Sequence, residues 1–212
     1  MRKSETFVIG IMVFIAVYFA VSLFSNSALK LDNASLVQHS QQPEVATPGL
    51  EHRFELLDVN GKVKTPRSFP GRYHLVYFGY TSCPDICPAS LGKISVVLDE
   101  LGNKIASRIT PLFISVDPEV DKPAELKAYM GQFDSRIVAL TPASKAELTA
   151  MVDSYRLVVQ QQPNDASGAR IIDHTALIYL FNPDGAFVTF FSPDQDATII
   201  AVAVSNAIAE GK

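Results

Sequence analysis

The pattern of apolar and polar residues divides the chain into three parts. The run from Phe7 to Phe24 contains no charged residue and reaches the ~18 residues that a membrane-spanning helix requires. The stretch that follows is rich in Ser, Gln and Asn and lacks apolar periodicity, which is typical of a flexible tether. The pattern therefore predicts a cytoplasmic tip and transmembrane anchor over residues 1–25, a tether over 26–49 and a folded domain over 50–212.

The residues that flank the apolar run predict its orientation. Arg2 and Lys3 precede it, and positive charge marks the cytoplasmic side of a membrane helix. Ser25-Asn26-Ser27 offers a weak signal-cleavage site, but the run exceeds the ~7–15 apolar residues of a signal peptide, which favours an uncleaved anchor. We therefore expect a single-pass protein of the bacterial inner membrane whose C-terminal domain lies in the periplasm. That compartment is oxidising, so thiols in it pair or hold metal.

Strand patterns and helix patterns alternate within the domain. Runs of aromatic and β-branched residues predict buried strands, and apolar residues at every third or fourth position predict amphipathic helices. The predicted strands are 54–58, 62–64, 73–80, 112–116, 137–140, 175–181 and 187–191, and the predicted helices are 90–101, 123–133, 144–155 and 197–209. This alternation predicts an α/β fold in which helices flank a mixed sheet, and ligands in such folds gather at the C-terminal ends of parallel strands.

Several polar segments separate these elements. Asn60-Gly61 predicts a hairpin turn, and Gly102 predicts the end of the helix that precedes it. Residues 182–185 (Asn-Pro-Asp-Gly) have the composition of a β-turn. The Gln-rich stretch 160–168 is expected to be a flexible excursion.

Composition and charge exclude one class of partner. The formal net charge is −4, and Lys and Arg form no cluster along the chain. Because neutralisation of phosphate charge supplies most of the affinity for nucleic acids, we expect no nucleic-acid partner.

The chain contains two cysteines, Cys83 and Cys87, and both lie between a predicted strand and a predicted helix. Pro88 would lose a hydrogen bond inside a helix, so we expect the helix to begin at Cys87-Pro88 and the two cysteines to share a turn. A thiolate at such a helix N-terminus is stabilised by the helix dipole. The pair can close a disulfide or bind a soft cation.

Three kinds of chemistry are open to this pair. A structural disulfide gains little stability from closing so short a loop. Thiol–disulfide exchange is a stronger alternative because oxidoreductases present thiols on such turns, although thioredoxin-like enzymes separate their cysteines by two residues rather than three. Metal binding needs a further ligand, and two thiolates with one imidazole suit copper in either oxidation state. A structural zinc site would need a fourth protein ligand.

The four histidines are the candidates for the third ligand. His39 lies in the predicted tether, His52 is expected to be exposed, and His74 is expected to be a structural or surface residue of its strand. His174 stands directly before the strand predicted at 175–181. In a thioredoxin-like arrangement a residue at that position faces the cysteine turn, so His174 is the favoured ligand.

Three motifs resemble those of a known family. Residues 77–88, which include both cysteines, resemble the signature of the Sco/SenC family, thioredoxin-fold copper chaperones of cytochrome c oxidase assembly. Residues 113–119 (Phe-Ile-Ser-Val-Asp-Pro-Glu) and 173–175 (Asp-His-Thr), the latter with Pro183-Asp184-Gly185, resemble the second and third motifs of the family in the same order. Arg170-Ile171-Ile172 stands where the family often has a tyrosine.

The resemblance implies both a ligand set and a function. Cys83, Cys87 and His174 would bind one copper ion, as Cu(I) or Cu(II), and Asp173 would orient His174. The chain would be a membrane-anchored copper chaperone, not an enzyme, that assists assembly of the copper A centre of cytochrome c oxidase. Its partners would be oxidase subunit II or another copper protein, and a thiol reductant. The segment 160–172 would move so that His174 can approach the thiols.

An enzymatic alternative remains open beside the chaperone role. The same thiols would serve a thiol–disulfide oxidoreductase that keeps the cysteines of a partner reduced.

Overall fold

The computed structural model describes residues 50–164, 168 and 170–212. The anchor predicted at 1–25, the tether at 26–49 and His39 lie outside these residues. Within the described part of the chain, none of the helices combines the length and the apolar character needed to cross a bilayer.

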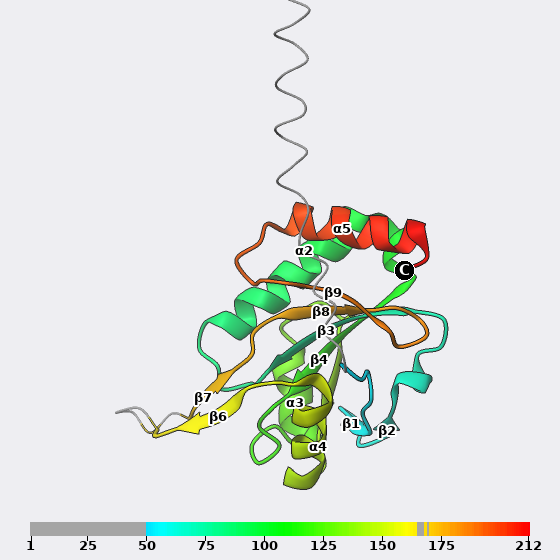
Figure 1. Ribbon diagram of the computed structural model, residues 1–212. Helices are drawn as coiled ribbons and strands as arrows, with labels where there is room; N and C mark the ends of the chain where they lie inside the picture. Colours follow the sequence, from blue (N-terminus) through cyan, green and yellow to red (C-terminus); the bar gives the residue numbers. More distant parts are fainter. Residues whose placement is uncertain (1–49, 165–167, 169) are drawn as a thin grey trace, which may run out of the picture. The chain divides into compact units, whose positions relative to one another are not determined.

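A seven-stranded mixed sheet forms the centre of the domain (Figure 1). Its strands lie in the order β2-β1-β5-β4-β3-β8-β9. They are β1 (Leu56–Asp58), β2 (Val63–Lys64), β3 (Tyr73–Gly79), β4 (Ile109–Ser115), β5 (Val138–Thr141), β8 (Ile178–Phe181) and β9 (Phe187–Phe191). The pairs β3–β4 and β4–β5 are parallel, and the remaining pairs are antiparallel. The mixed sheet predicted from the sequence is therefore confirmed.

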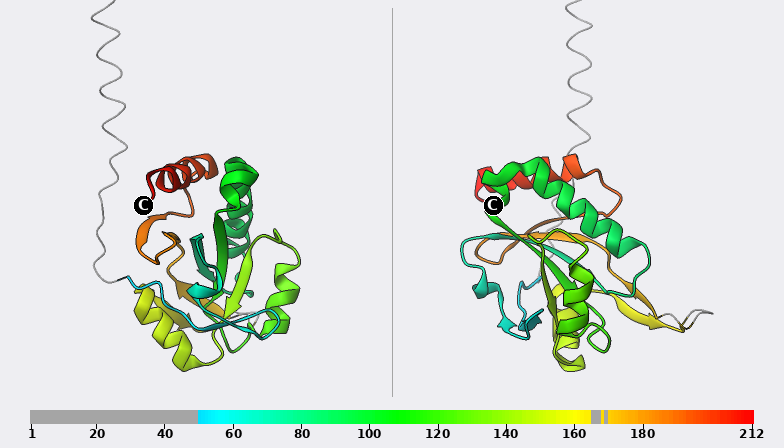
Figure 2. Two further views of the ribbon diagram at one scale, coloured as in Figure 1. Left: turned by 90° about the vertical axis from the view of Figure 1, so that its right-hand side faces the viewer. Right: turned by 180° about the vertical axis from the view of Figure 1, so that it is seen from behind.

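The helices cover both faces of this sheet. They are α2 (Ile86–Ala106), α3 (Pro123–Met130), α4 (Lys145–Tyr155) and α5 (Ala197–Glu210), with a short 3-10 helix, η1, at Pro66–Ser68. On one face Cys87 of α2 and Tyr129 of α3 adjoin Tyr77 and Phe113 of the central strands, and α5 lies alongside α2 (Figure 2). On the opposite face Tyr155 of α4 packs with its ring 4.9 Å from that of Phe78.

The helix after the cysteines begins earlier than the sequence predicted. α2 begins at Ile86, with Asp85 as the N-cap residue, and Pro88 occupies the third helical position. The first amides of a helix have no intrahelical partner, so a proline there removes no hydrogen bond. Gly102 was expected to end the helix; it has a left-handed φ of 64°, which interrupts the helix, and one further turn continues to Ala106.

The Gln-rich stretch contains regular structure that the sequence did not predict. β6 (Val159–Gln162) pairs antiparallel with β7 (Ile171–His174) in a separate two-stranded sheet, called here the arm (Figure 1). The predicted strand 175–181 is correspondingly wrong at its start, because β8 begins at Ile178 and His174 ends β7. Backbone hydrogen bonds form this ladder. The side chains of β6 are mostly polar, so the strand has no apolar pattern by which the sequence could predict it.

Candidate metal centre

Sheet register brings three segments to one edge of the sheet. Gly79 and Ser115 pair at the C-terminal ends of the parallel strands β3 and β4, so the cysteine turn and the loop after β4 begin side by side. β8 runs antiparallel to β3, and its first residue, Ile178, pairs with Tyr77. The arm that precedes β8 therefore ends at the same edge. His174, the last residue of β7, therefore lies beside the cysteine turn.

The three predicted ligand residues lie together. The Sγ of Cys87 is 3.7 Å from Nε2 of His174, and the Cys83 side chain forms hydrogen bonds with both Cys87 and His174. Both cysteines are free thiols and both are buried, Cys87 completely. The two thiols and the imidazole thus lie close together at a site of low solvent access, although within the described residues no three His, Cys, Asp or Glu side chains are arranged to hold a metal ion in this structure.

Hydrogen bonding separates the acidities of the two thiols. The side chain of Cys87 donates to Cys83, and with His174 and the backbone amides of Cys87 and Asp85 it lowers the pKa of Cys83 to about 4. The hydrogen bond to Cys83, together with burial, raises the pKa of Cys87 above its ordinary value. The pair therefore holds one proton, with Cys83 as thiolate and Cys87 as thiol.

The contacts of His174 define which of its nitrogens is free. Nδ1 lies 3.2 Å from the carbonyl oxygen of Thr175, and because a carbonyl only accepts, Nδ1 carries the hydrogen. Nε2 faces Cys87 Sγ at 3.7 Å, so it is the ring nitrogen that would bind a metal held by the thiols. The rings of Tyr77 and Tyr80 stand edge-on to the imidazole at 6.4 and 5.8 Å. The orientation suits a metal ligand.

Asp173 does not contact the His174 ring as the resemblance implied. Its carboxylate accepts a hydrogen bond from Nε2 of Gln162 across the arm, at 2.6 Å. Successive side chains of a strand point to opposite faces, so Asp173 turns away where His174 turns inward.

Close packing around Cys87 requires a glycine at position 79. A Cβ placed on Gly79 would lie 2.9 Å from Cys87 Sγ and 2.8 Å from the Phe113 ring. On the other side, the hydroxyl of Tyr77 donates to Cys87 Sγ at 3.7 Å. The sulfur therefore occupies a fixed position.

Sequence reasoning missed a buried carboxylate beneath the cysteine turn. Asp121 is fully buried and accepts hydrogen bonds from the amide of Thr81 at 3.0 Å, the hydroxyl of Thr81 at 2.5 Å and the hydroxyl of Ser115 at 2.6 Å. Burial nevertheless raises the pKa of Asp121. The aspartate ties the loop after β4 to the start of the cysteine turn. Nothing in the sequence besides its place after the second motif distinguished it from a surface carboxylate.

Two of the other histidines form a separate cluster. His52 was predicted to be exposed, and this is wrong: Nε2 of His52 contacts Nδ1 of His74, and Nδ1 of His52 lies 2.9 Å from the hydroxyl of Tyr155. Burial, with the neighbouring His74, lowers the pKa of His52 to about 3, and burial lowers the pKa of His74 as well. His74 was predicted to be a structural or surface residue of its strand; it is buried and belongs to this pair.

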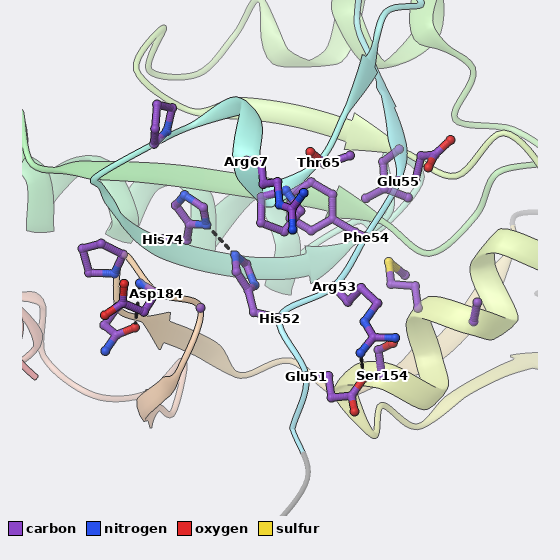
Figure 3. Close-up of a pocket in the computed structure, with 18 of the residues that line it drawn as sticks. Glu51, His52, Arg53, Phe54, Glu55, Thr65, Arg67, His74, Ser154 and Asp184 are labelled. Carbon is purple, nitrogen blue, oxygen red and sulfur yellow. Dashed lines mark hydrogen bonds and ion pairs between the residues drawn. The ribbon is translucent and has the colours of Figure 1, made fainter.

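A cavity of about 1090 Å³ adjoins this histidine pair (Figure 3). Its lining includes Arg53, Arg67, Ser154 and Asp184. His74 lies near the start of β3 and Gly79 at its end, so the pair is remote from the thiols. Neither histidine joins the candidate metal centre.

The architecture and the edge site define a thioredoxin-like α/β domain that presents two thiols and an imidazole at one point. Comparison with known proteins identifies its family. The SCO1/SenC family profile matches residues 42–209, and the chain belongs to this family.

The relatives include mitochondrial and bacterial proteins. The human protein "Protein SCO1 homolog, mitochondrial" is 32% identical over 196 residues, which cover 91% of this chain and 65% of the relative. The zebrafish (Danio rerio) "Protein SCO2 homolog, mitochondrial" is 39% identical over 154 residues, 72% of this chain and 55% of the relative. The chain thus spans 55–65% of the length of these curated relatives.

Solved structures with copper resemble the domain. Bradyrhizobium japonicum ScoI with copper bound is 41% identical with a TM-score of 0.67, and the match covers 74% of this chain and 98% of that one. Yeast Sco1 with copper bound is 32% identical with a TM-score of 0.70, covering 76% of this chain and 90% of that one.

Proposed function

We propose that this chain is a copper chaperone that binds one copper ion through Cys83, Cys87 and His174. The observation that carries the proposal is the convergence of the three side chains, with Nε2 of His174 3.7 Å from Cys87 Sγ. The donor set fits the metal, because thiolates favour Cu(I) and an added imidazole accommodates Cu(II). Copper-bound structures of Bradyrhizobium and yeast relatives support copper as the bound ion.

The low pKa of Cys83 favours metal capture. Thiolate is the form that binds metal, and Cys83 is already in that form near neutral pH. Cys87 holds the shared proton and must release it when copper binds. Copper binding is therefore coupled to the loss of one proton from the thiol pair, and affinity rises with pH.

Metal analysis of the full chain in detergent tests the ligand set. We expect one copper per chain, with loss of most copper in Cys83→Ser and Cys87→Ser. His174→Ala should lose the Cu(II) absorption and nitrogen coupling of the wild type while its two thiolates still bind Cu(I). An unchanged Cu(II) spectrum and affinity in His174→Ala would contradict the three-ligand site.

The recipient of the copper is proposed to be the copper A centre of cytochrome c oxidase, on subunit II. Family membership supports this role. Deletion of the gene should lower copper A absorbance in isolated oxidase, and a Cys83→Ser chain should fail to restore it. Normal copper A content in the deletion strain would contradict the proposed client.

The proposed location is the periplasmic side of the bacterial inner membrane, with residues 1–25 as a single-pass anchor. The uncharged run from Phe7 to Phe24 and the preceding Arg2 and Lys3 support this topology. Protease added to spheroplasts should digest the domain while the protein remains in the membrane fraction. Protection from protease would contradict it.

Thiol–disulfide exchange is the second candidate, favoured by the unequal acidities of the two cysteines. The Cys83 thiolate would attack a partner disulfide to form a mixed disulfide and release one partner thiolate. Cys87, once deprotonated, would then attack Cys83 Sγ, release the second partner thiolate and leave an oxidised pair. Reductase turnover that survives in His174→Ala, in a protein that binds no copper, would favour this alternative.

A further inference from the structure

The arm that carries His174 lies outside the main sheet. β6 and β7 pair only with each other, and neither pairs with a strand of the seven-stranded sheet. Ladder hydrogen bonds therefore do not fix the arm to the domain. The short link from His174 to β8 and the contacts of the arm with the body therefore set the position of His174 relative to the thiols.

Arg170, immediately before β7, makes the principal charged contact from the arm to the body. Its Nε lies 2.8 Å from Oδ2 of Asp117 and its Nη2 lies 2.9 Å from Oδ1 of the same carboxylate. Nη2 also lies 3.2 Å from Oε2 of Glu119. The two parallel bonds to Asp117 fix the guanidinium plane as well as its distance, which a single bond does not.

Asp117 is a firm anchor for this contact. Its side chain is 2% exposed, and its backbone amide donates a hydrogen bond to Oγ of Ser115 at 3.0 Å. The amides of Val120 and Asp121 both donate to its carbonyl oxygen. The carboxylate therefore sits on a tightly hydrogen-bonded turn at the end of a central strand.

The same turn also supports the cysteines. Asp121, four residues after Asp117, binds the amide and hydroxyl of Thr81, which lies two residues before Cys83. One turn thus contacts the arm through Asp117 and the cysteine turn through Asp121. The position of this turn therefore sets the distance between His174 on the arm and the two cysteines.

We propose that Arg170 is a positioning residue for this centre: its ion pair with Asp117 holds the arm so that His174 meets the thiols. The inference rests on the proposed copper function. The amide of Ile172, which donates to the Tyr80 hydroxyl at 3.3 Å, is the neighbouring uncharged contact.

Arg170→Met tests the proposal in the full chain in detergent. It keeps the alkyl bulk and removes both bonds to Asp117. Loss of a residue that orients a ligand lowers metal affinity roughly 10–100-fold, and we expect this loss for Cu(II), measured by competition with a chelator. The nitrogen coupling in the Cu(II) electron paramagnetic resonance spectrum should weaken, whereas Cu(I), held by two thiolates, should be retained.

Two further variants separate position from charge. Arg170→Lys keeps the charge but cannot form the fork, so its Cu(II) affinity should fall between those of the wild type and Arg170→Met. Lys145→Met is the matched control, because it removes another cation paired with Glu119, at 2.5 Å, on α4 rather than on the arm. It should leave Cu(II) binding unchanged.

The possible outcomes distinguish a failure of the proposed Arg170 role from a failure of the proposed copper site. Unchanged Cu(II) affinity and nitrogen coupling in Arg170→Met, with both altered in His174→Ala, would overturn the role of Arg170 and leave the ligand set intact. Equal losses in Lys145→Met and Arg170→Met would also overturn it, because the effect would then be general electrostatics. No change in His174→Ala would overturn the proposed function instead.

Discussion

His174 and Gly79 show how single residues set the geometry of the proposed centre. Nδ1 of His174 donates a hydrogen bond to the carbonyl oxygen of Thr175, and Nε2 faces Cys87. Gly79 provides the space into which the sulfur of Cys87 fits. The bond from Nδ1 to Thr175 leaves Nε2 of His174 as the atom that would bind metal, and the lack of a side chain at Gly79 leaves space for Cys87 Sγ.

Gly79→Ala should therefore disrupt both packing and metal binding. The new Cβ would meet Cys87 Sγ at 2.9 Å, and overpacking of this kind costs about 1–3 kcal/mol. Gly92→Ala is the control: it lies within α2 with nothing within 4 Å of the added Cβ, and should stabilise the domain by about 0.5–1 kcal/mol. Denaturant unfolding and copper titration measure the two effects. Wild-type behaviour of Gly79→Ala would contradict the packing argument.

Cys83 should be the more reactive thiol in the metal-free reduced protein. Its pKa of about 4 means that its alkylation rate should be level across neutral pH and decline only as pH falls toward that value. Cys87→Ser removes the thiol that donates to Cys83, and because this hydrogen bond lowers the pKa of Cys83, that pKa should rise. Iodoacetamide kinetics against pH measure this. A midpoint near the pKa of an ordinary thiol in the wild type would contradict the shared-proton pair.

The His52–His74 pair predicts acid sensitivity. Both pKa values are lowered in the folded state, so the stabilisation is complete above the unfolded value of about 6.5 and declines as pH falls below it, for His52 down to about 3. Each histidine contributes a slope of at most ~1.4 kcal/mol per pH unit. Unfolding free energies at pH 5 to 7 should show a shallower slope in a His52→Gln, His74→Gln chain. An equal slope would contradict this.

Among the elements, the arm differs from the seven-stranded sheet in the number of strands that support each ligand residue. It is two strands wide and bears His174, whereas the cysteines follow a strand with neighbours on both sides. The sequence-based expectation that 160–172 moves stays a prediction. Amides of β6 and β7 should exchange faster than those of β3 in the metal-free protein, and copper should slow them. Identical exchange with and without copper would contradict coupling of the arm to the metal.

Local sequence signals accounted for elements whose cause is local. Ser144 accepts from the Glu147 amide and caps α4, and Asp196 caps α5 by accepting from the Thr198 amide. The hairpin at Asn60-Gly61 is also confirmed. The arm was missed because its cause lies in the pairing of segments whose side chains are mostly polar.

At the scale of the whole domain, apolar periodicity was sufficient to predict the mixed sheet and its helices. It could not predict contacts made between distant positions. His52 was misplaced because its partners, His74 and Tyr155, are 22 and 103 residues away. The contacts of Asp121 and Arg170 were not predicted for the same reason, since their partners are 40 and 53 residues away. The proximity of His174 to the cysteines was anticipated through the likeness to a thioredoxin-like arrangement.

The separate attachment of the arm would have a kinetic consequence for the proposed copper transfer. Two of the proposed donors, Cys83 and Cys87, follow a central strand and the third, His174, lies on the arm, so the three metal bonds would not need to break together. Movement of the arm would free one coordination position while both sulfurs kept the ion. A donor from a recipient protein could then occupy that position before either sulfur left. Copper would then pass by stepwise exchange and never enter the solvent as a free ion.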